Sequence, residues 1–308
     1  MTQPRRIREG ATFLITRRAL RRHCLFAPDP RITQLFVFAL AWCAQMFGVE
    51  IHAAILMSTH EHLVVTDVRG VLPMFLQMFH RLVALATKVV RKWEGPVWDH
   101  EPPSIVELVT PEAVIQEIGY AIANPAAAGL VERARDWPGV TTLVEQLAGG
   151  VLVAARPTFF FSASNPQWGE RASVTLTLPP MLEELYTPES FREAVAAEVE
   201  RIELEAKAAQ REKGRAFAGP KRCERISPYR RMKGYEPIRD RNPVIAAGRG
   251  QSATRIEAIR LLRTFRAAYR DALDRWRTGL REVVFPAGTW AMARLHAAIV
   301  ERALATAA

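Results

Sequence analysis

The first half of the chain alternates between short apolar, β-branched runs and longer stretches with helical spacing. The short runs predict four strands, at residues 11–16, 49–57, 63–68 and 104–109. The longer stretches predict three helices, over residues 30–47, over residues 70–93, and from residue 111 onward. Local signals support the helix ends, because Asp29 precedes Pro30, Gly48 follows the first helix, and Thr110-Pro111-Glu112 opens the third. The predicted order is βαββαβα.

That order is typical of the α+β class, and specifically of the ferredoxin-like split βαβ pattern with a four-stranded antiparallel sheet. In this pattern the helices cover one face of the sheet, so we expect the other face to be free for a site. RNA binders, metal carriers and nucleases all use the same arrangement. The pattern therefore predicts a fold and leaves the function to particular residues.

The second half has a different character. A chain of 308 residues is longer than one hydrophobic core usually supports, so we expect a catalytic domain at residues 1–150 and a mainly helical, basic C-terminal region at residues 151–308. That region is predicted to hold short extended segments at 159–161 and 172–178, a helix from Thr187 toward Lys213, a basic linker at 214–250, and a long terminal helix. An apolar stripe marks the terminal helix, formed by Ile256, Ile259, Leu262, Tyr269, Leu273, Trp276 and Leu280. We expect it first to pack on the catalytic domain, with dimerisation or DNA contact as alternatives.

Composition excludes several classes of protein. Apolar residues make up 49% of the chain and charged residues 24%, which is typical of a folded globular protein. The longest apolar run, Leu35 to Phe47, contains Gln45 and is shorter than the roughly 20 residues that span a bilayer, so no membrane partner is expected. The basic amino terminus lacks the apolar segment of a secretion signal, and the three cysteines lack CxxC spacing. We expect a cytoplasmic protein without disulfides or a zinc knuckle.

The positive charge is concentrated in two zones. Residues 1–150 carry 15 basic and 14 acidic side chains, whereas the remainder carries 27 basic and 18 acidic ones. Within the nearly neutral first half, seven arginines lie in the first 25 residues against Glu9 alone. Such zones favour polyanions through Coulomb attraction and counterion release, although a solvated charged face is an equally ordinary explanation.

A histidine pair and a tyrosine are the candidate residues for metal binding and catalysis. His60 and His62 are two apart in an extended segment, so both rings point to one side and can grip one ion. Tyr120 and Asn124 are four apart on the predicted third helix and share a face. A phenol with a usual pKa of about 10 is a weak nucleophile at neutral pH unless a cation assists it. We interpret Tyr120 as the nucleophile and His60, His62 and Asn124 as ligands of Mg²⁺ or Mn²⁺. The ordinary alternatives are surface histidines, a half-buried tyrosine, and an asparagine that ends or kinks the helix before Pro125.

Several of these segments together resemble one family. Residues 55–65, Ile-Leu-Met-Ser-Thr-His-Glu-His-Leu-Val-Val, resemble the strand, turn and HxH strand of the HUH single-tyrosine transposases, and especially of the REP-associated tyrosine transposases. Tyr120-Ala-Ile-Ala-Asn124-Pro125, with Gly129-Leu130-Val131 after it, resembles the tyrosine helix of that family. Asp136-Trp137-Pro138 matches a further segment. The resemblance covers residues from about 8 to 140.

The resemblance implies transesterification. Tyr120 would attack a phosphate in single-stranded DNA and would form a 5′-phosphotyrosine and a free 3′-hydroxyl, without any nucleotide cofactor. His60 and His62 carry over as metal ligands, Asn124 as a further ligand, and a DNA hairpin as partner of a monomer or homodimer. Relatives bind that hairpin near the edge of the sheet where the amino-terminal arginines lie, so we expect DNA contacts from Arg17, Arg18, Arg21 and Arg22.

One residue departs from the family pattern. The middle residue of the family's HxH motif is hydrophobic, whereas this chain has Glu61. A carboxylate that points into a core costs several kcal/mol unless it is paired or neutralised. We therefore expect Glu61 to contact an arginine, to turn outward, or to mark an altered site.

Two other functions fit parts of the sequence. A domesticated DNA-binding protein with weak or no catalysis would keep the fold and the basic zones. An RNA-binding module of the same topology would carry paired aromatic residues on its central strands, in the neighbourhood that His60 and His62 occupy.

Overall fold

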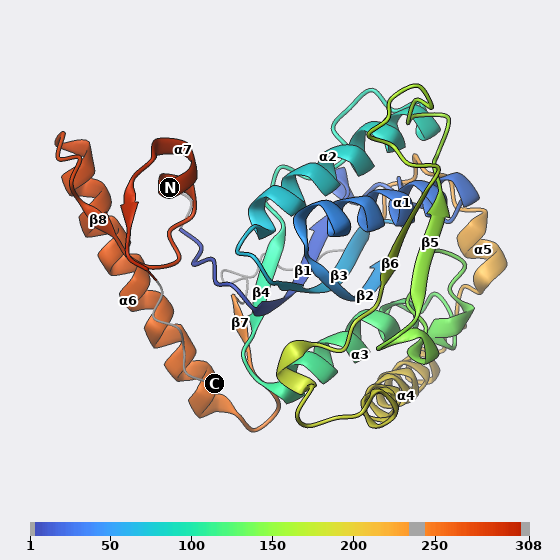
Figure 1. The fold of residues 1–308 in the computed structure, drawn as a ribbon. Coiled ribbons are helices and arrows are strands. Elements are labelled where there is room, and N and C mark those ends of the chain that lie inside the picture. Colours follow the sequence, from blue (N-terminus) through green and yellow to red (C-terminus); the bar gives the residue numbers. More distant parts are fainter. Residues whose placement is uncertain (1–3, 234–243, 303–308) are drawn as a thin grey trace.

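The computed structural model describes residues 4–233 and 244–302 (Figure 1). Its central sheet has the strand order β2-β3-β1-β4-β7, and the first four strands are antiparallel to their neighbours. The strands are β1 (Ala11–Arg18), β2 (Glu50–Leu56), β3 (His60–Asp67), β4 (Ser104–Leu108) and β7 (Ile245–Ala246). The α+β prediction and the ferredoxin-like order of the first four strands are confirmed. The short strand β7 adds a fifth, parallel to β4.

Helices α1 (Pro30–Phe47) and α2 (Leu72–Arg91) cover one face of this sheet (Figure 1). The predicted ends of α1 are confirmed, because the Asp29 side chain accepts a hydrogen bond from the backbone N–H of Arg31 at 2.8 Å. Gly48 ends the helix in the left-handed region, at φ 66°, where a residue without Cβ is least strained. Aromatic rings fill the layer between the helices and the sheet, among them Phe36 and Phe79, whose ring centroids are 5.4 Å apart.

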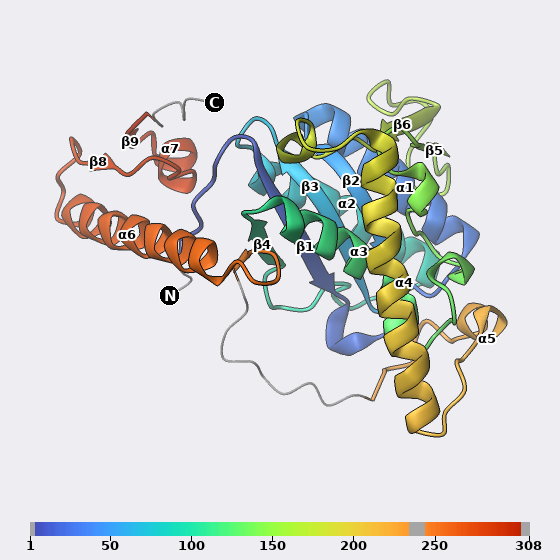
Figure 2. The same ribbon diagram turned by 90° about the horizontal axis from the view of Figure 1, so that it is seen from below.

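The second face of the sheet is covered as well, by α3 (Pro111–Ala127), and α4 (Pro188–Glu212) lies along α3 (Figure 2). The expectation of a free face was wrong. The reason is that the strands are apolar on both faces: Leu14, Ile55 and Val64 point away from α1 and α2 and are buried with α3. Strands that are apolar on both sides need a cover on both sides.

The turn between β2 and β3 is shorter than predicted. The predicted strands left residues 58–62 between them, but His60 and Glu61 already belong to β3, where they pair with Arg18 and Arg17 of β1. A hydrogen bond from the backbone N–H of Met57 to the carbonyl of His60, at 2.8 Å, closes the turn. The strand pairing thus begins at the first histidine.

The first part of the region after residue 150, up to residue 224, does not form a core of its own. The hairpin of β5 (Val151–Ala155) and β6 (Arg171–Thr175) packs on α1, and α4 packs on α3. Phe159–Phe161 is a turn rather than a strand, and Phe161 is buried beside Phe38 of α1. The predicted helix from Thr187 to Lys213 is confirmed, with Thr187 as its N-cap. Residues 151–224 therefore share the two cores of residues 1–150, and the boundary predicted at residue 150 does not separate two cores.

The predicted linker at 214–250 is partly docked. Backbone hydrogen bonds join Ala218 and Gly219 to Gly129 and Leu130, and α5 (Pro220–Glu224) follows. Residues 234–243 of this linker lie outside the described residues. Short 3₁₀ helices complete the main body: η1 (Leu20–Arg22), η2 (Ala134–Asp136), η3 (Val144–Gln146) and η4 (Pro180–Leu182).

The last described elements form an arm beside β4 (Figures 1 and 2). It consists of α6 (Ser252–Arg277), β8 (Val284–Phe285), α7 (Ala291–His296) and β9 (Ile299–Val300). Leu262 and Phe265 pack with Ile245 of β7 and with Val109. Tyr269, Leu273 and Trp276 instead pack within the arm, in the cluster that holds Phe285, and Ile256 and Leu280 are 65% and 54% exposed. None of the described helices has the length and apolar character needed to cross a membrane.

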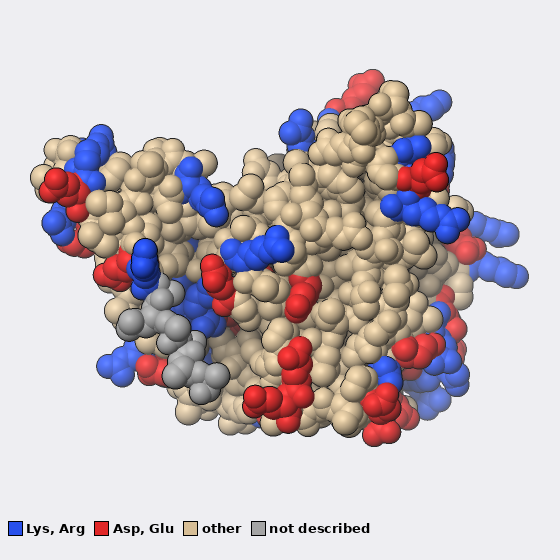
Figure 3. Space-filling view, in the orientation of Figure 1, with Lys and Arg blue, Asp and Glu red and all other residues tan. Residues whose placement is uncertain are grey.

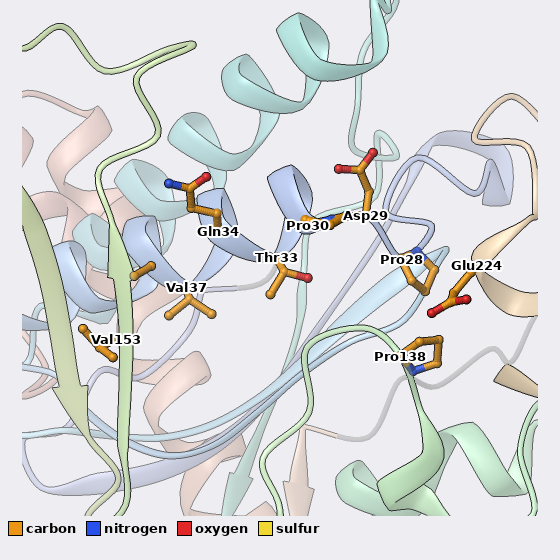
Figure 4. Close-up of a pocket in the computed structure, with 10 residues that line it drawn as sticks. Pro28, Asp29, Pro30, Thr33, Gln34, Val37, Pro138, Val153 and Glu224 are labelled. Carbon is orange, nitrogen blue, oxygen red and sulfur yellow. The ribbon is translucent and has the colours of Figure 1, made fainter. Parts of the chain in front are cut away.

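A surface pocket of about 550 Å³ lies at the amino-terminal end of α1 (Figure 4). Its lining comes from α1, from β5 and from the segments around Pro138 and Glu224, so it marks where the later part of the chain meets the earlier part. Its lining does not include His60, His62 or Tyr120. The pocket is therefore distinct from the candidate site.

Helices α3 and α4 meet closely at Gly119, next to Tyr120. A Cβ atom added to Gly119 would lie 2.5 Å from Cγ of Glu198 on α4. The Glu198 carboxylate accepts hydrogen bonds from Arg201 and from Arg249, both at 2.6 Å to Oε1. These bonds lower the pKa of Glu198 to about 2, and the hydrogen bond from Arg201 contributes most to the shift.

This pKa predicts a pH dependence of stability. Because the pKa of Glu198 in the folded protein lies below its usual 4.5, the stabilisation is complete above about pH 4.5 and is lost as the pH falls toward 2. We expect Glu198→Gln to lower the urea midpoint at pH 7 and to flatten its decline between pH 4.5 and 2.5. The exposed Glu193→Gln on the same helix is the control and should follow the parent protein. Parallel curves for the Glu198 variant and the parent would contradict the assignment.

Candidate functional site

The two histidines lie on the α3 side of β3. Residues two apart in a strand share a face, and Val64, the next residue in this series, is buried in the core under α3. The ring centroids of His60 and His62 are 4.8 Å apart, with the rings nearly perpendicular. The two rings therefore share one side of the strand, as the spacing predicted, and that side faces the helix that carries Tyr120.

His62 has one nitrogen engaged and one without a partner. Its Nδ1 is 2.9 Å from Oγ1 of Thr16, the residue that pairs with it across the β1–β3 ladder. Its Nε2 is buried and has no hydrogen-bond partner among the described residues. Burial, with smaller contributions from His60 and Arg18, lowers the pKa of His62 well below 6.5. The ring is neutral at neutral pH, and a proton on Nδ1 directed to Thr16 leaves the Nε2 lone pair available to a cation.

Tyr120 stands beside His62 in the same chain. Their ring centroids are 5.6 Å apart, and the rings meet edge to face at 76°. Tyr120 is 41% exposed, so a ligand from solvent can reach it. The cap of α3 sets its position, because the Thr110 side chain accepts a hydrogen bond from the N–H of Ala113.

Asn124 lies one helical turn after Tyr120, on the buried side of α3. The sequence suggested a kink or a helix end at this residue, because Pro125 follows it. The helix instead runs to Ala127, and the carbonyl of Asn124 accepts a hydrogen bond from the N–H of Ala128 at 2.9 Å. Four-residue spacing therefore holds, and Asn124 shares the Tyr120 side of α3.

His60, His62 and Asn124 offer donor atoms of the kinds that a divalent ion accepts. Two imidazoles and the amide oxygen of Asn124 are nitrogen and oxygen donors of the kind that Mg²⁺ and Mn²⁺ accept, and the unpartnered Nε2 of His62 is a ready ligand atom. No group of three or more His, Cys, Asp or Glu within the described ranges could hold a metal. The side chains do not build a closed cage, and positions on the ion would stay open for a substrate.

Glu61 points to the other face of β3, into the α1–α2 core, and is fully buried. One of its oxygens, Oε1, is 2.5 Å from Nε2 of His80 on α2. Nδ1 of His80 accepts a hydrogen bond from Arg17 at 2.7 Å, so the His80 proton is on Nε2 and is donated to Glu61. The expected arginine is present, but it acts on Glu61 through a histidine. Burial lowers the pKa of His80, against the opposing effect of Glu61.

The four arginines predicted to bind DNA have different environments. Arg17 is part of the buried network and lies over the ring of Trp98 at 5.1 Å. Arg18 is exposed and pairs with His60 in the ladder, on the face of the site. Arg21 and Arg22 lie in the 3₁₀ turn after β1, with left-handed backbone angles of φ 47° and 59°. Arg18 is thus on the face of the site, Arg21 and Arg22 lie in the turn that follows it, and Arg17 is directed into the protein.

The sequence did not single out Thr16, His80 or Asp99 as parts of this region. Thr16 orients His62, His80 pairs with Glu61, and Asp99 accepts a hydrogen bond from the N–H of Arg21 at 3.2 Å. Only the strand register and the packing of α2 bring them there. Trp137 of the DWP segment donates a hydrogen bond to the carbonyl of Leu56 at 3.0 Å, so it fixes the segment after α3 to β2.

Removal of one partner of the Glu61–His80 pair should be costly. We expect His80→Leu to destabilise the protein by about 3 to 5 kcal/mol, since it leaves a buried carboxylate without its donor. The double variant Glu61→Leu/His80→Leu should recover most of that loss, because both polar groups are gone. Chemical denaturation of the two variants checks this. A double variant no more stable than His80→Leu would exclude the pairing.

Comparisons with known proteins find similarity to solved structures alone. A scan against protein-family models finds no match, and a search of curated proteins finds none either. Among solved structures, the chain is similar to a REP-associated tyrosine transposase bound to a REP hairpin, with 19% identity, a TM-score of 0.41, and coverage of 47% of this chain and 85% of that one. It is also similar to a candidate transposase of Deinococcus radiodurans, with 17% identity, a TM-score of 0.28, and coverage of 39% and 95%.

Proposed function

We propose that this protein is a DNA transposase that cuts and rejoins single-stranded DNA through a covalent 5′-phosphotyrosine at Tyr120. The observation that carries the proposal is the contact between Tyr120 and His62, with ring centroids 5.6 Å apart and the Nε2 of His62 buried without a partner. The proposed nucleophile therefore lies beside the proposed metal ligands, at a position that solvent can reach. Hairpin-associated repeats are the proposed targets, following the resemblance stated from the sequence.

The reaction needs little beyond positioning. Oη of Tyr120 attacks the phosphorus, an Oη–P bond forms as the P–O3′ bond breaks, and the phenol proton is balanced by the proton that the 3′-oxygen takes up. The energy of the phosphodiester is kept in the phosphotyrosine, so a 3′-hydroxyl can reverse the step with another strand. Tyr120 is 41% exposed, so a DNA strand can reach its hydroxyl group.

The protein's own groups would prepare the site for a cation. Thr16 holds Nδ1 of His62 and so directs Nε2 outward from the strand. Thr59 does the same for His60, with Oγ1 3.0 Å from Nδ1. A bound Mg²⁺ or Mn²⁺, with Asn124 as a further ligand, would polarise the phosphate and favour the phenolate.

The proximity of Tyr120 to histidines of its own chain supports catalysis within one subunit. A monomer can then be complete, and a homodimer is compatible with the same site. Neither arrangement requires exchange of α3 between chains.

The alternative functions have less support. An RNA-binding module of this topology stacks bases on an uncovered sheet, but here α1 and α2 cover one face and α3 the other. A domesticated, inactive DNA binder would have no need to keep Tyr120, His60, His62 and Asn124 together. We therefore favour the enzyme.

The nucleophile can be tested directly. We expect Tyr120→Phe to abolish the covalent adduct with a single-stranded hairpin oligonucleotide, because the attacking oxygen is gone, while hairpin affinity stays within about twofold of the parent protein. Denaturing gel electrophoresis measures the adduct and fluorescence anisotropy the affinity. A parental adduct yield from this variant would remove Tyr120 from the mechanism.

The histidine pair can be tested through metal dependence. We expect EDTA or His62→Ala to stop cleavage in the presence of Mn²⁺. Thr16→Val, which removes only the partner of Nδ1, should reduce apparent Mn²⁺ affinity by roughly 10- to 100-fold, as outer-shell partners do. Calorimetric titration with Mn²⁺ checks the variants independently of cleavage. Full activity in EDTA, or parental Mn²⁺ binding by His62→Ala, would refute the ligand assignment.

A further inference from the structure

The two basic zones of the sequence meet in space. Residues 227–233, after α5, run antiparallel to the turn that follows β1. The N–H of Cys24 donates to the carbonyl of Arg230 at 2.9 Å, and the N–H of Met232 donates to the carbonyl of Arg22 at 3.1 Å. Figure 2 shows the orange segment after α5 and the blue turn after β1 in the same part of the molecule. The first half and the extension therefore form one continuous surface here.

An aromatic stack lies in the middle of this surface. The His23 and Trp93 ring centroids are 5.1 Å apart, and the Trp93 and Tyr229 centroids 6.2 Å apart with the last two rings stacked. The stack is anchored, because Tyr229 donates to the carbonyl of Arg91 at 2.5 Å and Trp93 to that of Pro96 at 2.9 Å. Tyr229 is nevertheless 54% exposed. A fixed, exposed ring is a surface on which a planar group can stack.

Basic side chains surround the stack. The exposed cations are Arg21, Lys92, Arg230, Arg231 and Lys233, and the adjoining acids include Glu94 and Asp99, which accepts a hydrogen bond from the N–H of Arg21. Figure 3, drawn in the orientation of Figure 1, shows blue side chains at the edge of the molecule near α5 as well as on the arm. A ring system flanked by an excess of cations suits a polyanion with planar, apolar groups.

The backbone here is strained. Arg21, Arg22 and Lys92 have φ angles of 47°, 59° and 49°, and they are three of the five non-glycine residues with positive φ among the described residues. Side-chain-bearing residues adopt this region at a cost and keep it where the surroundings hold them, most often at functional sites. Asp99 and the carbonyl of Ala19 hold the N–H groups of Arg21 and Arg22.

The surface begins where the candidate site ends. Arg18 pairs with His60, and the N–H of Ala19 donates to the carbonyl of Thr59 at 2.8 Å. His23 is five positions after Arg18, and an extended chain spans about 3.5 Å per residue, so the two Cα atoms are at most roughly 18 Å apart. A short single strand can reach from one to the other.

We propose that His23, Trp93 and Tyr229, with Arg21 and Arg230 beside them, form a stacking platform for the single-stranded DNA that flanks the scissile phosphate. This inference rests on the proposed function and assigns a role to the extension. Unpaired bases offer ring faces to Tyr229, whereas stacked bases of a duplex do not, so the platform prefers single strands. Because every base has such a face, it contributes affinity rather than sequence choice.

The test measures binding without chemistry. In a Tyr120→Phe background with EDTA, Tyr229→Ala should weaken binding of a labelled oligo-dT by about 5- to 150-fold, the range expected for loss of one stacked base. Affinity for a blunt duplex of equal charge should stay unchanged. Tyr229→Phe, which keeps the ring and loses only the hydrogen bond to the Arg91 carbonyl, is the matched control and should lose less affinity for oligo-dT than Tyr229→Ala. Failure of Tyr120 chemistry would leave these affinities intact, so the two proposals are tested separately.

Three results would overturn the platform: parental oligo-dT affinity for Tyr229→Ala, an equal loss of duplex affinity, or competition by polyglutamate as strong as by oligo-dT. An experiment on the unaltered chain covers the case in which Tyr229→Ala misfolds. Irradiation with bromodeoxyuridine-containing single strands should give crosslinks that map to His23, Trp93 or Tyr229. If every crosslink mapped to other residues, the proposal would also be overturned.

Discussion

The antiparallel ladder between β1 and β3 is the constraint on which the candidate site depends. It places Thr16 opposite His62 and Arg18 opposite His60, so the strand that carries the histidines is oriented by its neighbour residue by residue. A shift of one residue would turn both imidazoles away from α3 and bring Glu61 to the site. Apolar residues on both faces of β3 resist such a shift, because Leu63 and Val65 belong to one core and Val64 to the other.

The extension completes this arrangement. Helix α4 covers α3 at Gly119, where a side chain would collide with Glu198, and so holds the helix that carries Tyr120. Arg249 joins the same carboxylate from the segment before α6. Further along, residues 227–233 line the turn that leaves the site. The parts of the chain beyond the resembling segment thus support the helix that carries Tyr120 and extend the surface beside it.

Glu61 illustrates how a departure from a pattern can be accommodated. A carboxylate in place of an apolar residue is costly in a core, and here His80 donates to it while Arg17 donates to His80. Because Arg17 donates to His80, its side chain is directed into the protein, although its position in an arginine cluster suggested a role at the surface. One substitution in the middle of the motif therefore has a consequence on the neighbouring strand.

Local signals in the sequence determined the elements. Asp29 and Thr110 cap their helices, Gly48 ends one, and the two-residue spacing of His60 and His62 puts both rings on one side, since these effects depend on neighbours a few residues away. Tertiary structure alone decided the rest: the cover over the second face of the sheet, the partner of Glu61, the approach of Tyr120 to His62, and the meeting of Tyr229 with Trp93 and His23. Each of these joins residues far apart in the chain, and strand register and helix packing, which bring them together, leave no local mark in the sequence.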